Sequence, residues 1–179
     1  MATAILFLLF SPLGALHQDY LVNESVDVGS KAPTFYLKSL DGGEFFLSRL
    51  VGEPITGFRK ESGKKTVVLS FFATWCISCK GELPLLERIY REYSNESLNV
   101  ILIDVEENEN KVKVYIDSLR LNIPVLMDFH GVVAQKYNVV ALPTLLIINK
   151  DGIIELRSFG YKGEDHFRAL ITNKLDELL

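Results

Sequence analysis

The sequence predicts an α/β fold, in which helices cover both faces of a mixed central sheet. Residues 66–72 form a near-continuous apolar run with the β-branched and aromatic content of a strand buried on both faces. Apolar residues at helical spacing follow this run, and strand-like and helical segments then alternate along the chain. Two strand-like runs joined by the turn-forming residues 149–152, and then one amphipathic helix, complete the pattern.

The expected elements begin with a β-hairpin, formed by residues 34–37 and 44–47 about the turn Asp41-Gly42-Gly43. Later strands are expected at 66–72, 99–104, 124–127, 144–149 and 153–159, and later helices around 83–93, 112–119, 132–137 and 167–178. Pro84 lies in the first of these helices, and we expect a bend there because proline has no backbone N–H to donate.

The composition is that of one soluble globular domain. The chain has a mass of 20.2 kDa, and 48% of its residues are hydrophobic and 23% charged. Its formal net charge of -4 and sequence pI of about 5.4 offer no basic patch to a phosphate backbone. We therefore expect no nucleic-acid partner.

The N-terminal end has the character of an export signal. Residues 4–10 are an unbroken apolar run, and Ala15 is an acceptable residue before a cleavage site, although no Lys or Arg precedes the run. We expect residues 1–16 to be a signal peptide or N-terminal anchor, 17–30 a polar linker, and 31–179 the folded domain. A buried N-terminal strand is the alternative for the apolar run. The export reading predicts an extracytoplasmic protein.

The only two cysteines of the chain, Cys76 and Cys79, lie between the strand at 66–72 and the helix that follows. This places Cys76 at the helix start, where unpaired N–H groups and the helix dipole lower a thiol pKa from about 8.5 to roughly 3.5–7.5. We therefore take Cys76 as the candidate nucleophile, exposed at the helix terminus, and Cys79 as the resolving thiol inside the helix.

A structural zinc site and a purely structural disulfide are the alternatives for the cysteine pair. A structural zinc site needs two further ligands at short spacing, but His17, His130 and His166 are scattered. A purely structural disulfide would close too short a loop to constrain the unfolded chain much. A redox-active dithiol is favoured, and neither a metal nor another cofactor is expected.

Several short motifs resemble one family. They are Ala32-Pro33-x-Phe35, Leu40-Asp41-Gly42, Ala73-Thr74-Trp75-Cys76, Glu82-Leu83-Pro84, the stretch 137–143 and Asp151-Gly152. With these motifs, the chain from residue 31 to the C-terminus resembles the extracytoplasmic TlpA, ResA and CcmG branch of the thioredoxin fold. The resemblance to the fold itself lies in Trp75-Cys76-Ile77-Ser78-Cys79, Leu142-Pro143-Thr144 and the terminal β-β-α pattern. The resemblance implies an N-terminal hairpin extension, a helix inserted after the second core strand, and thiol-disulfide oxidoreductase activity.

The resemblance also implies a role for Glu82. Cytosolic thioredoxin has a buried aspartate six residues before its first active-site cysteine, but Ser70 stands there in this chain. The resembling branch has a glutamate three residues after the second cysteine, and Glu82 fills that position. A carboxylate buried near Cys79 would have a raised pKa and could accept its proton. An ordinary exposed helical glutamate is the alternative.

Three further residues are candidate substrate contacts. By the resemblance, Pro143 is expected to be cis, and Leu142 before it to offer backbone hydrogen bonds to an extended substrate. Pro143 could instead simply mark a strand edge. Trp75 is expected either to shield the site and supply apolar surface or to fill the core.

The leading hypothesis is therefore dithiol-disulfide exchange with another protein. By the resemblance, partners include disulfide-bearing proteins such as apocytochrome c or a metallochaperone, and an upstream membrane thiol reductase. A peroxiredoxin-like peroxidase is one alternative, but it needs a proline where Ser70 stands. A copper chaperone is the second alternative. The related copper-binding proteins of this fold use C-x-x-x-C plus a histidine, whereas here the gap is one residue shorter and His130 has no supporting motif.

Overall fold

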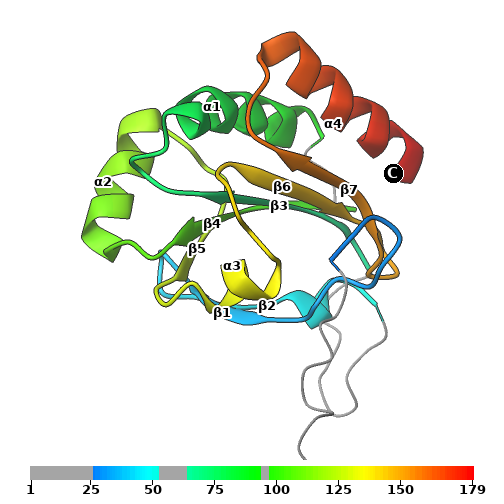
Figure 1. The fold of residues 1–179 in the computed structure, drawn as a ribbon, viewed down its shortest axis with the longest axis horizontal. Helices are drawn as coiled ribbons and strands as arrows, with labels where there is room; N and C mark the ends of the chain where they lie inside the picture. Colours follow the sequence, from blue (N-terminus) through cyan, green and yellow to red (C-terminus); the bar gives the residue numbers. More distant parts are fainter. Residues whose placement is uncertain (1–25, 53–63, 94–96) are drawn as a thin grey trace, which may run out of the picture.

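The computed structural model describes residues 26–52, 64–93 and 97–179 (Figure 1). Its strands are β1 (Tyr36–Ser39), β2 (Glu44–Phe46), β3 (Thr66–Phe72), β4 (Leu98–Val105), β5 (Val125–Asp128), β6 (Thr144–Ile148) and β7 (Ile154–Phe159). Its helices are α1 (Ile77–Glu92), α2 (Glu109–Leu119), α3 (Val132–Lys136) and α4 (Glu164–Leu178), with a short 3-10 helix at Leu47–Arg49. This order of elements is the predicted one.

The strands form one mixed sheet in the order β2-β1-β5-β4-β3-β6-β7. β3 and β5 both pair in parallel with β4, whereas the remaining neighbours are antiparallel. Helices α1, α2 and α4 lie on one side of the sheet and α3 on the other (Figure 1). The predicted α/β fold with helices on both faces is confirmed, and α2 occupies the place of the expected inserted helix between β4 and β5.

The predicted N-terminal hairpin is confirmed, but β1 lies two residues later than expected. Its turn runs from Ser39 to Gly43, whose carbonyl accepts the Ser39 N–H at 2.9 Å. Gly42 takes a φ of 88°, which glycine adopts without a steric penalty. The hairpin extends the sheet, because Lys38 and Ser39 pair with Met127 and Leu126 of β5.

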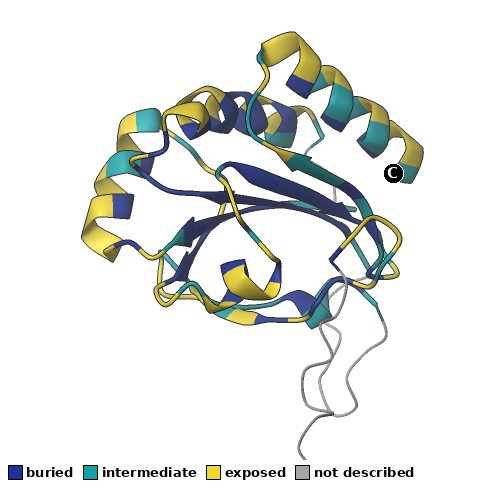
Figure 2. Cartoon of the chain, viewed as in Figure 1, coloured by how far each residue is buried: buried dark blue, intermediate teal, exposed yellow. Residues whose placement is uncertain are grey.

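Strand β3 lies in the middle of the sheet, and all seven of its residues are buried (Figure 2). One core cluster, to which α1, α2 and α4 contribute, contains Phe72 and both cysteines. The other, to which α3 contributes, contains Phe71 and Tyr137. Burial on both faces explains why β3 reads as a continuous apolar run rather than an alternating one.

The folded part of the chain begins earlier than the sequence suggests. Val26 is only 2% exposed, and the N–H of Gly29 donates to the carbonyl of Ile154 at 2.8 Å. Residues 26–30, expected at the end of the linker, therefore belong to the domain, because Val26 supplies apolar surface to its core. The expected signal or anchor at 1–16 and the rest of the linker lie outside the described residues.

Among residues 26–52, 64–93 and 97–179, no helix is long and apolar enough to cross a membrane. Pro84 lies inside α1, which continues through it as one helix.

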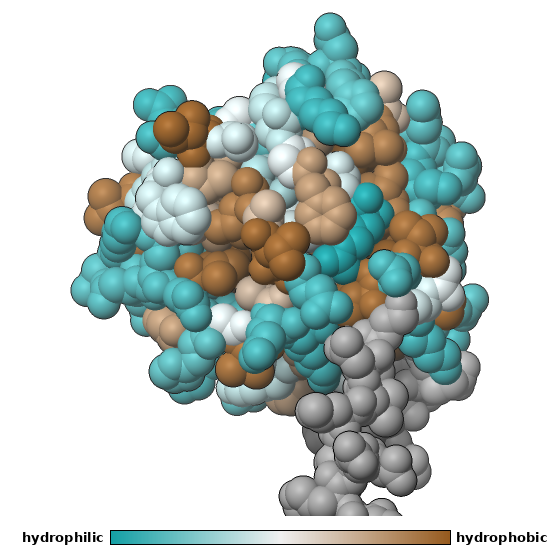
Figure 3. Space-filling view, viewed as in Figure 1, coloured by the Kyte–Doolittle hydropathy of each residue, from teal (hydrophilic) through white to brown (hydrophobic). Residues whose placement is uncertain are grey.

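On the face drawn in Figure 3, hydrophobic side chains gather near the middle, and hydrophilic ones occupy much of the surrounding surface.

Arg157 ties the N-terminal segment to the rest of the domain, and this contact can be tested. Its guanidinium donates to the carbonyls of Val26 at 2.6 Å and of Tyr137 and Asn138 at 2.9 Å. Arg157→Met should lower the free energy of unfolding by about 1–3 kcal/mol, because three carbonyls lose a charged donor. Denaturant titration measures the change.

Arg168→Met is the matched control. Arg168 forms an ion pair with Glu92 in which both side chains are more than 40% exposed, so its loss should cost less than about 1 kcal/mol. Equal losses in the two variants would show that the Arg157 contacts do not hold the segment.

Candidate active site

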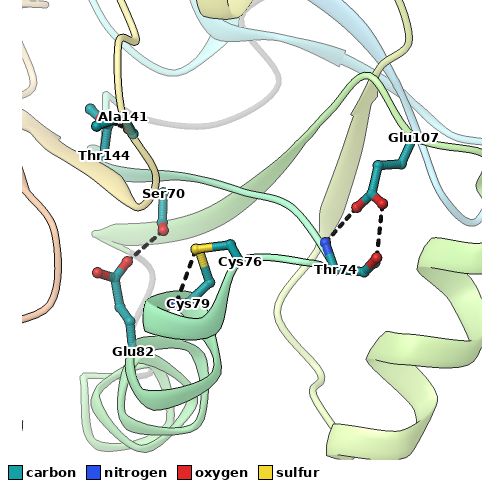
Figure 4. The surroundings of a disulfide bond; sticks show 8 residues. All are labelled: Ser70, Thr74, Cys76, Cys79, Glu82, Glu107, Ala141 and Thr144. Carbon is teal, nitrogen blue, oxygen red and sulfur yellow. Dashed lines mark hydrogen bonds between the residues drawn. A yellow bond between two sulfur atoms is a disulfide. The ribbon is translucent and has the colours of Figure 1, made fainter.

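The two cysteines lie where β3 ends and α1 begins, and they form a disulfide with a Cα–Cα distance of 5.3 Å (Figure 4). Cys76 is the N-cap of α1, and its Sγ accepts the backbone N–H of Cys79 at 3.1 Å. The N–H of Cys76 in turn donates to the carbonyl of Ala73 at 3.1 Å. Because an N-cap atom faces the unpaired N–H groups of a helix, this geometry favours a negatively charged sulfur at Cys76.

Both sulfur-bearing residues are buried, contrary to the expectation that Cys76 is exposed. Cys76 is 5% exposed and Cys79 is 0% exposed, because both belong to the core cluster beneath α1. The residues beside Cys76 are the exposed ones, with Trp75 at 67% and Ile77 at 83%. Trp75 therefore does not fill the core, and that alternative is wrong.

Glu82 lies inside the protein, one helical turn after Cys79. It is 1% exposed, and its Oε1 accepts the hydroxyl of Ser70 at 2.7 Å (Figure 4). Burial raises the pKa of the Glu82 carboxyl to about 7, against the opposing effect of the Ser70 hydrogen bond. The exposed-helix alternative for Glu82 is therefore wrong. Ser70, noted from the sequence only as the residue replacing an aspartate, is its hydrogen-bond partner.

Pro143 and Leu142 lie at the same edge of the sheet as the cysteines. The peptide bond between them is cis, as predicted. The register of β3 and β6 pairs Phe71 with Thr144, so the chain enters β6 through Pro143 beside the point where β3 leaves for Cys76. Leu142 is partly buried and packs against the cluster that contains both cysteines.

Two acidic residues that sequence reasoning missed lie on the other side of the disulfide. The carboxylate of Glu107 accepts both the backbone N–H and the hydroxyl of Thr74, the latter at 2.8 Å (Figure 4). Asp104, at 0% exposed, accepts the N–H of Glu107 at 3.2 Å. The sequence does hold a signal that could have pointed to both residues. They lie near the carboxyl end of β4, which is parallel to β3. The carboxyl ends of parallel strands meet at one edge of a sheet.

The described residues include no group of three or more His, Cys, Asp or Glu side chains arranged to hold a metal ion. His130 lines a surface pocket with Tyr36 and Met127, between β1 and α3. The structure does not bring His130 and the cysteines together into one site.

Comparisons with known proteins agree with this geometry. The model of the AhpC/TSA family matches residues 28–157. The thiol-disulfide oxidoreductase ResA of Bacillus thuringiensis is 31% identical over 150 residues, which cover 83% of this chain and 80% of the relative. The thioredoxin-like protein YneN of Bacillus subtilis is 33% identical over 144 residues, which cover 78% and 76%.

Solved structures show the same fold. A protein of Chlorobium tepidum assigned as the thiol:disulfide interchange protein DsbE superposes with a TM-score of 0.73 at 24% identity, covering 87% of this chain and all of that one. StoA of Bacillus subtilis superposes with a TM-score of 0.60 at 21% identity, covering 76% and 95%. Together with the buried cysteine pair at the start of α1, these matches show that the chain belongs to the AhpC/TSA family and is a ResA-like thiol-disulfide oxidoreductase with a thioredoxin fold.

Proposed function

We propose that this oxidoreductase reduces disulfides of partner proteins through Cys76 and Cys79. The Cys76 thiolate attacks one sulfur of the substrate disulfide, forms a mixed disulfide and releases the other substrate sulfur as a thiolate. Cys79 then attacks the Cys76 sulfur, which frees the second substrate sulfur and leaves the Cys76–Cys79 disulfide. Two electrons pass to the substrate. The observation that carries this proposal is the N-cap position of Cys76, where Sγ accepts the Cys79 N–H.

Glu82 is the proposed proton acceptor for Cys79. The two residues lie three positions apart on α1, so they share one face of the helix, and both are buried. Cys79 must lose its proton before it can attack the mixed disulfide. Glu82 can take this proton in its ionised form, which becomes populated as the pH rises through about 7.

The residues around the buried cysteines form the proposed docking surface for substrate. Trp75, Ile77 and Val140 are between 67% and 86% exposed, and Leu142 and Pro143 precede β6 at the same edge of the sheet. An extended polypeptide laid along residues 141–143 would bring its disulfide to Cys76 and its apolar side chains onto this surface.

The proposed site of action is extracytoplasmic, at the periplasm or the outer face of the cytoplasmic membrane. The apolar run at 4–10 supports this as a signal or a tether. One structural neighbour, from Mycobacterium tuberculosis, is described as a secreted disulfide oxidoreductase. Apocytochrome c or a metallochaperone is the proposed class of substrate, with a membrane thiol reductase returning Cys76 and Cys79 to the reduced state.

The two thiols of the reduced protein should differ in reactivity. Iodoacetamide at neutral pH should alkylate Cys76 at least about tenfold faster than Cys79, because the N-cap position favours the thiolate at Cys76. Peptide mass spectrometry after timed quenching measures both rates, and Cys76→Ser gives the rate of Cys79 alone. Equal rates would remove the assignment of Cys76 as nucleophile.

Glu82→Gln should slow disulfide exchange and remove the increase in rate as the pH passes about 7. The fold should survive, because the amide oxygen can still accept the Ser70 hydroxyl. The folded-state pKa of Glu82 lies above its ordinary value, so the wild type loses stability as the pH rises toward about 7. The glutamine variant should lack that loss. A wild-type pH profile of exchange in the variant would exclude Glu82 as the proton acceptor.

Cys79→Ser should accumulate the mixed disulfide on Cys76, because the group that resolves it is absent. Non-reducing electrophoresis of the protein recovered from native extract should show the adduct, and its other half identifies the substrate. Adding Leu142→Arg should reduce trapping, because a bulky charge would sit where the substrate docks.

Val140→Arg tests the same docking surface at a residue 86% exposed, and Val114→Arg, on α2 and 70% exposed, is the matched control. Equal amounts of the mixed disulfide with Leu142→Arg, Val140→Arg and Val114→Arg would exclude docking beside Pro143. Absence of any protein adduct, while Cys76 still reacts with small disulfides, would exclude protein substrates. Peroxide consumption or stoichiometric copper binding by the reduced protein would then favour a peroxidase or a copper chaperone.

A further inference from the structure

Thr74 connects the turn before Cys76 to a buried acidic residue in the loop between β4 and α2. Glu107, 33 residues later in the chain, accepts both the N–H and the hydroxyl of Thr74. Glu107 is 9% exposed, and its other partner is Lys111 of α2. In Figure 4 the disulfide lies between two carboxyl groups, with Glu82 on one side and Glu107 on the other. The mechanism above uses only Glu82.

Glu107 accepts hydrogen bonds from the turn that leads directly into Cys76. Thr74 is two residues before Cys76, and the exposed Trp75 lies between them. At the other end of the turn, Cys76 donates its N–H to the Ala73 carbonyl. Because both Thr74 donors are bound to one carboxylate, the turn cannot rotate about Thr74 without breaking a charge-assisted hydrogen bond.

Asp104 lies directly beside Glu107 and is fully buried. Its Oδ1 accepts the N–H of Glu107, whereas its Oδ2 has no hydrogen-bond partner among the described residues. Burial and the nearby charge of Glu107 raise the pKa of Asp104 above that of an ordinary carboxyl group.

The other charged and titratable groups facing this pair lie on α2 and β5. Lys111 forms an ion pair with Glu107, and burial with the nearby Glu107 charge raises the pKa of Tyr115. On β5, Asp128 pairs with Val105, and its carboxylate accepts the N–H of Ala134. Asp128 is therefore engaged elsewhere, and Lys111 is the one cation among the named neighbours.

We propose that Glu107 is a positioning residue for Cys76, which holds the Thr74–Cys76 turn in the geometry needed for disulfide exchange, and that ionisation of the neighbouring Asp104 weakens this hold. This inference rests on the exchange reaction proposed above. While Asp104 is protonated, the pair carries one negative charge. Once Asp104 is ionised, two adjacent buried carboxylates repel each other, and the hold on Thr74 weakens.

Thr74→Val tests this hold without changing any charge. The variant loses the hydroxyl donor and keeps the shape of the side chain, whereas Thr74→Ser keeps the hydroxyl. In reduced protein, Thr74→Val should move the pH profile of Cys76 alkylation to higher pH and slow exchange with a protein disulfide by about tenfold. Thr74→Ser should restore both toward wild type.

Glu107→Ala and the double variant test whether the two residues act together. Glu107→Ala should also slow exchange, and adding Thr74→Val should slow it no further, because the alanine variant already lacks the acceptor of the Thr74 hydroxyl. Glu109→Ala is the matched control, since Glu109 is exposed in the first turn of α2. If Thr74→Val lowers stability but leaves the alkylation profile and exchange rate at wild type, the contact is only structural and the proposal is wrong.

Asp104→Asn tests the effect of Asp104 ionisation. The variant cannot place a second charge beside Glu107, so the ratio of its exchange rate to that of the wild type should increase as the pH rises. A ratio that stays constant as the pH rises would overturn the role of Asp104. Alkylation of Cys76 reports the hold on the turn without any protein substrate. Failure of wild-type exchange would therefore count against the proposed function, and an unchanged alkylation profile against the positioning role of Glu107.

Discussion

The burial of β3 between β4 and β6 is the constraint on which the rest of the active site depends. All seven residues of β3 are buried, so its end point, and with it the start of α1, has little freedom to move. Cys76 becomes the N-cap of α1 because the chain leaves β3 at Phe72 and turns at once into the helix. The same pairing brings Pro143 to this edge through β6, and Asp104 through β4, where it lies opposite Phe72. One strand therefore aligns groups from three distant parts of the chain.

Two buried carboxyl groups flank the disulfide, and their surroundings give them different properties. Glu82 is held by a neutral hydroxyl, that of Ser70, and burial raises the pKa of Glu82 toward neutrality. Glu107 has Lys111 and both Thr74 donors, and these hydrogen bonds lower its pKa despite the opposing effect of burial. A carboxyl that titrates near neutral pH suits proton transfer, whereas one that stays ionised suits a permanent hydrogen-bond acceptor. The two sides of the site are thus chemically distinct although the residue type is the same.

The cysteines are buried while the side chains next to them are exposed, and this arrangement limits what can react. Trp75 and Ile77 flank Cys76 in the sequence and are largely exposed, whereas Cys76 itself is buried. Under the proposed function, a protein that packs against these apolar side chains would gain contact energy while it delivers its disulfide to Cys76. A small solute would gain little from the same surface.

The sequence by itself determined the features that depend on local pattern. Residues 66–72 predict a doubly buried strand from their composition, and residues 149–152 predict a hairpin turn. The helical spacing of apolar residues after the cysteines places Cys76 at a helix start. Only the tertiary structure decided that Val26 belongs to the core, that Cys76 is buried, and that Glu82 meets Ser70 and Glu107 meets Thr74. These facts depend on which strands become neighbours and on how deeply each is covered. Contacts between residues 33 positions apart leave no periodic trace in the sequence, because strand order is fixed by the packing of the whole domain.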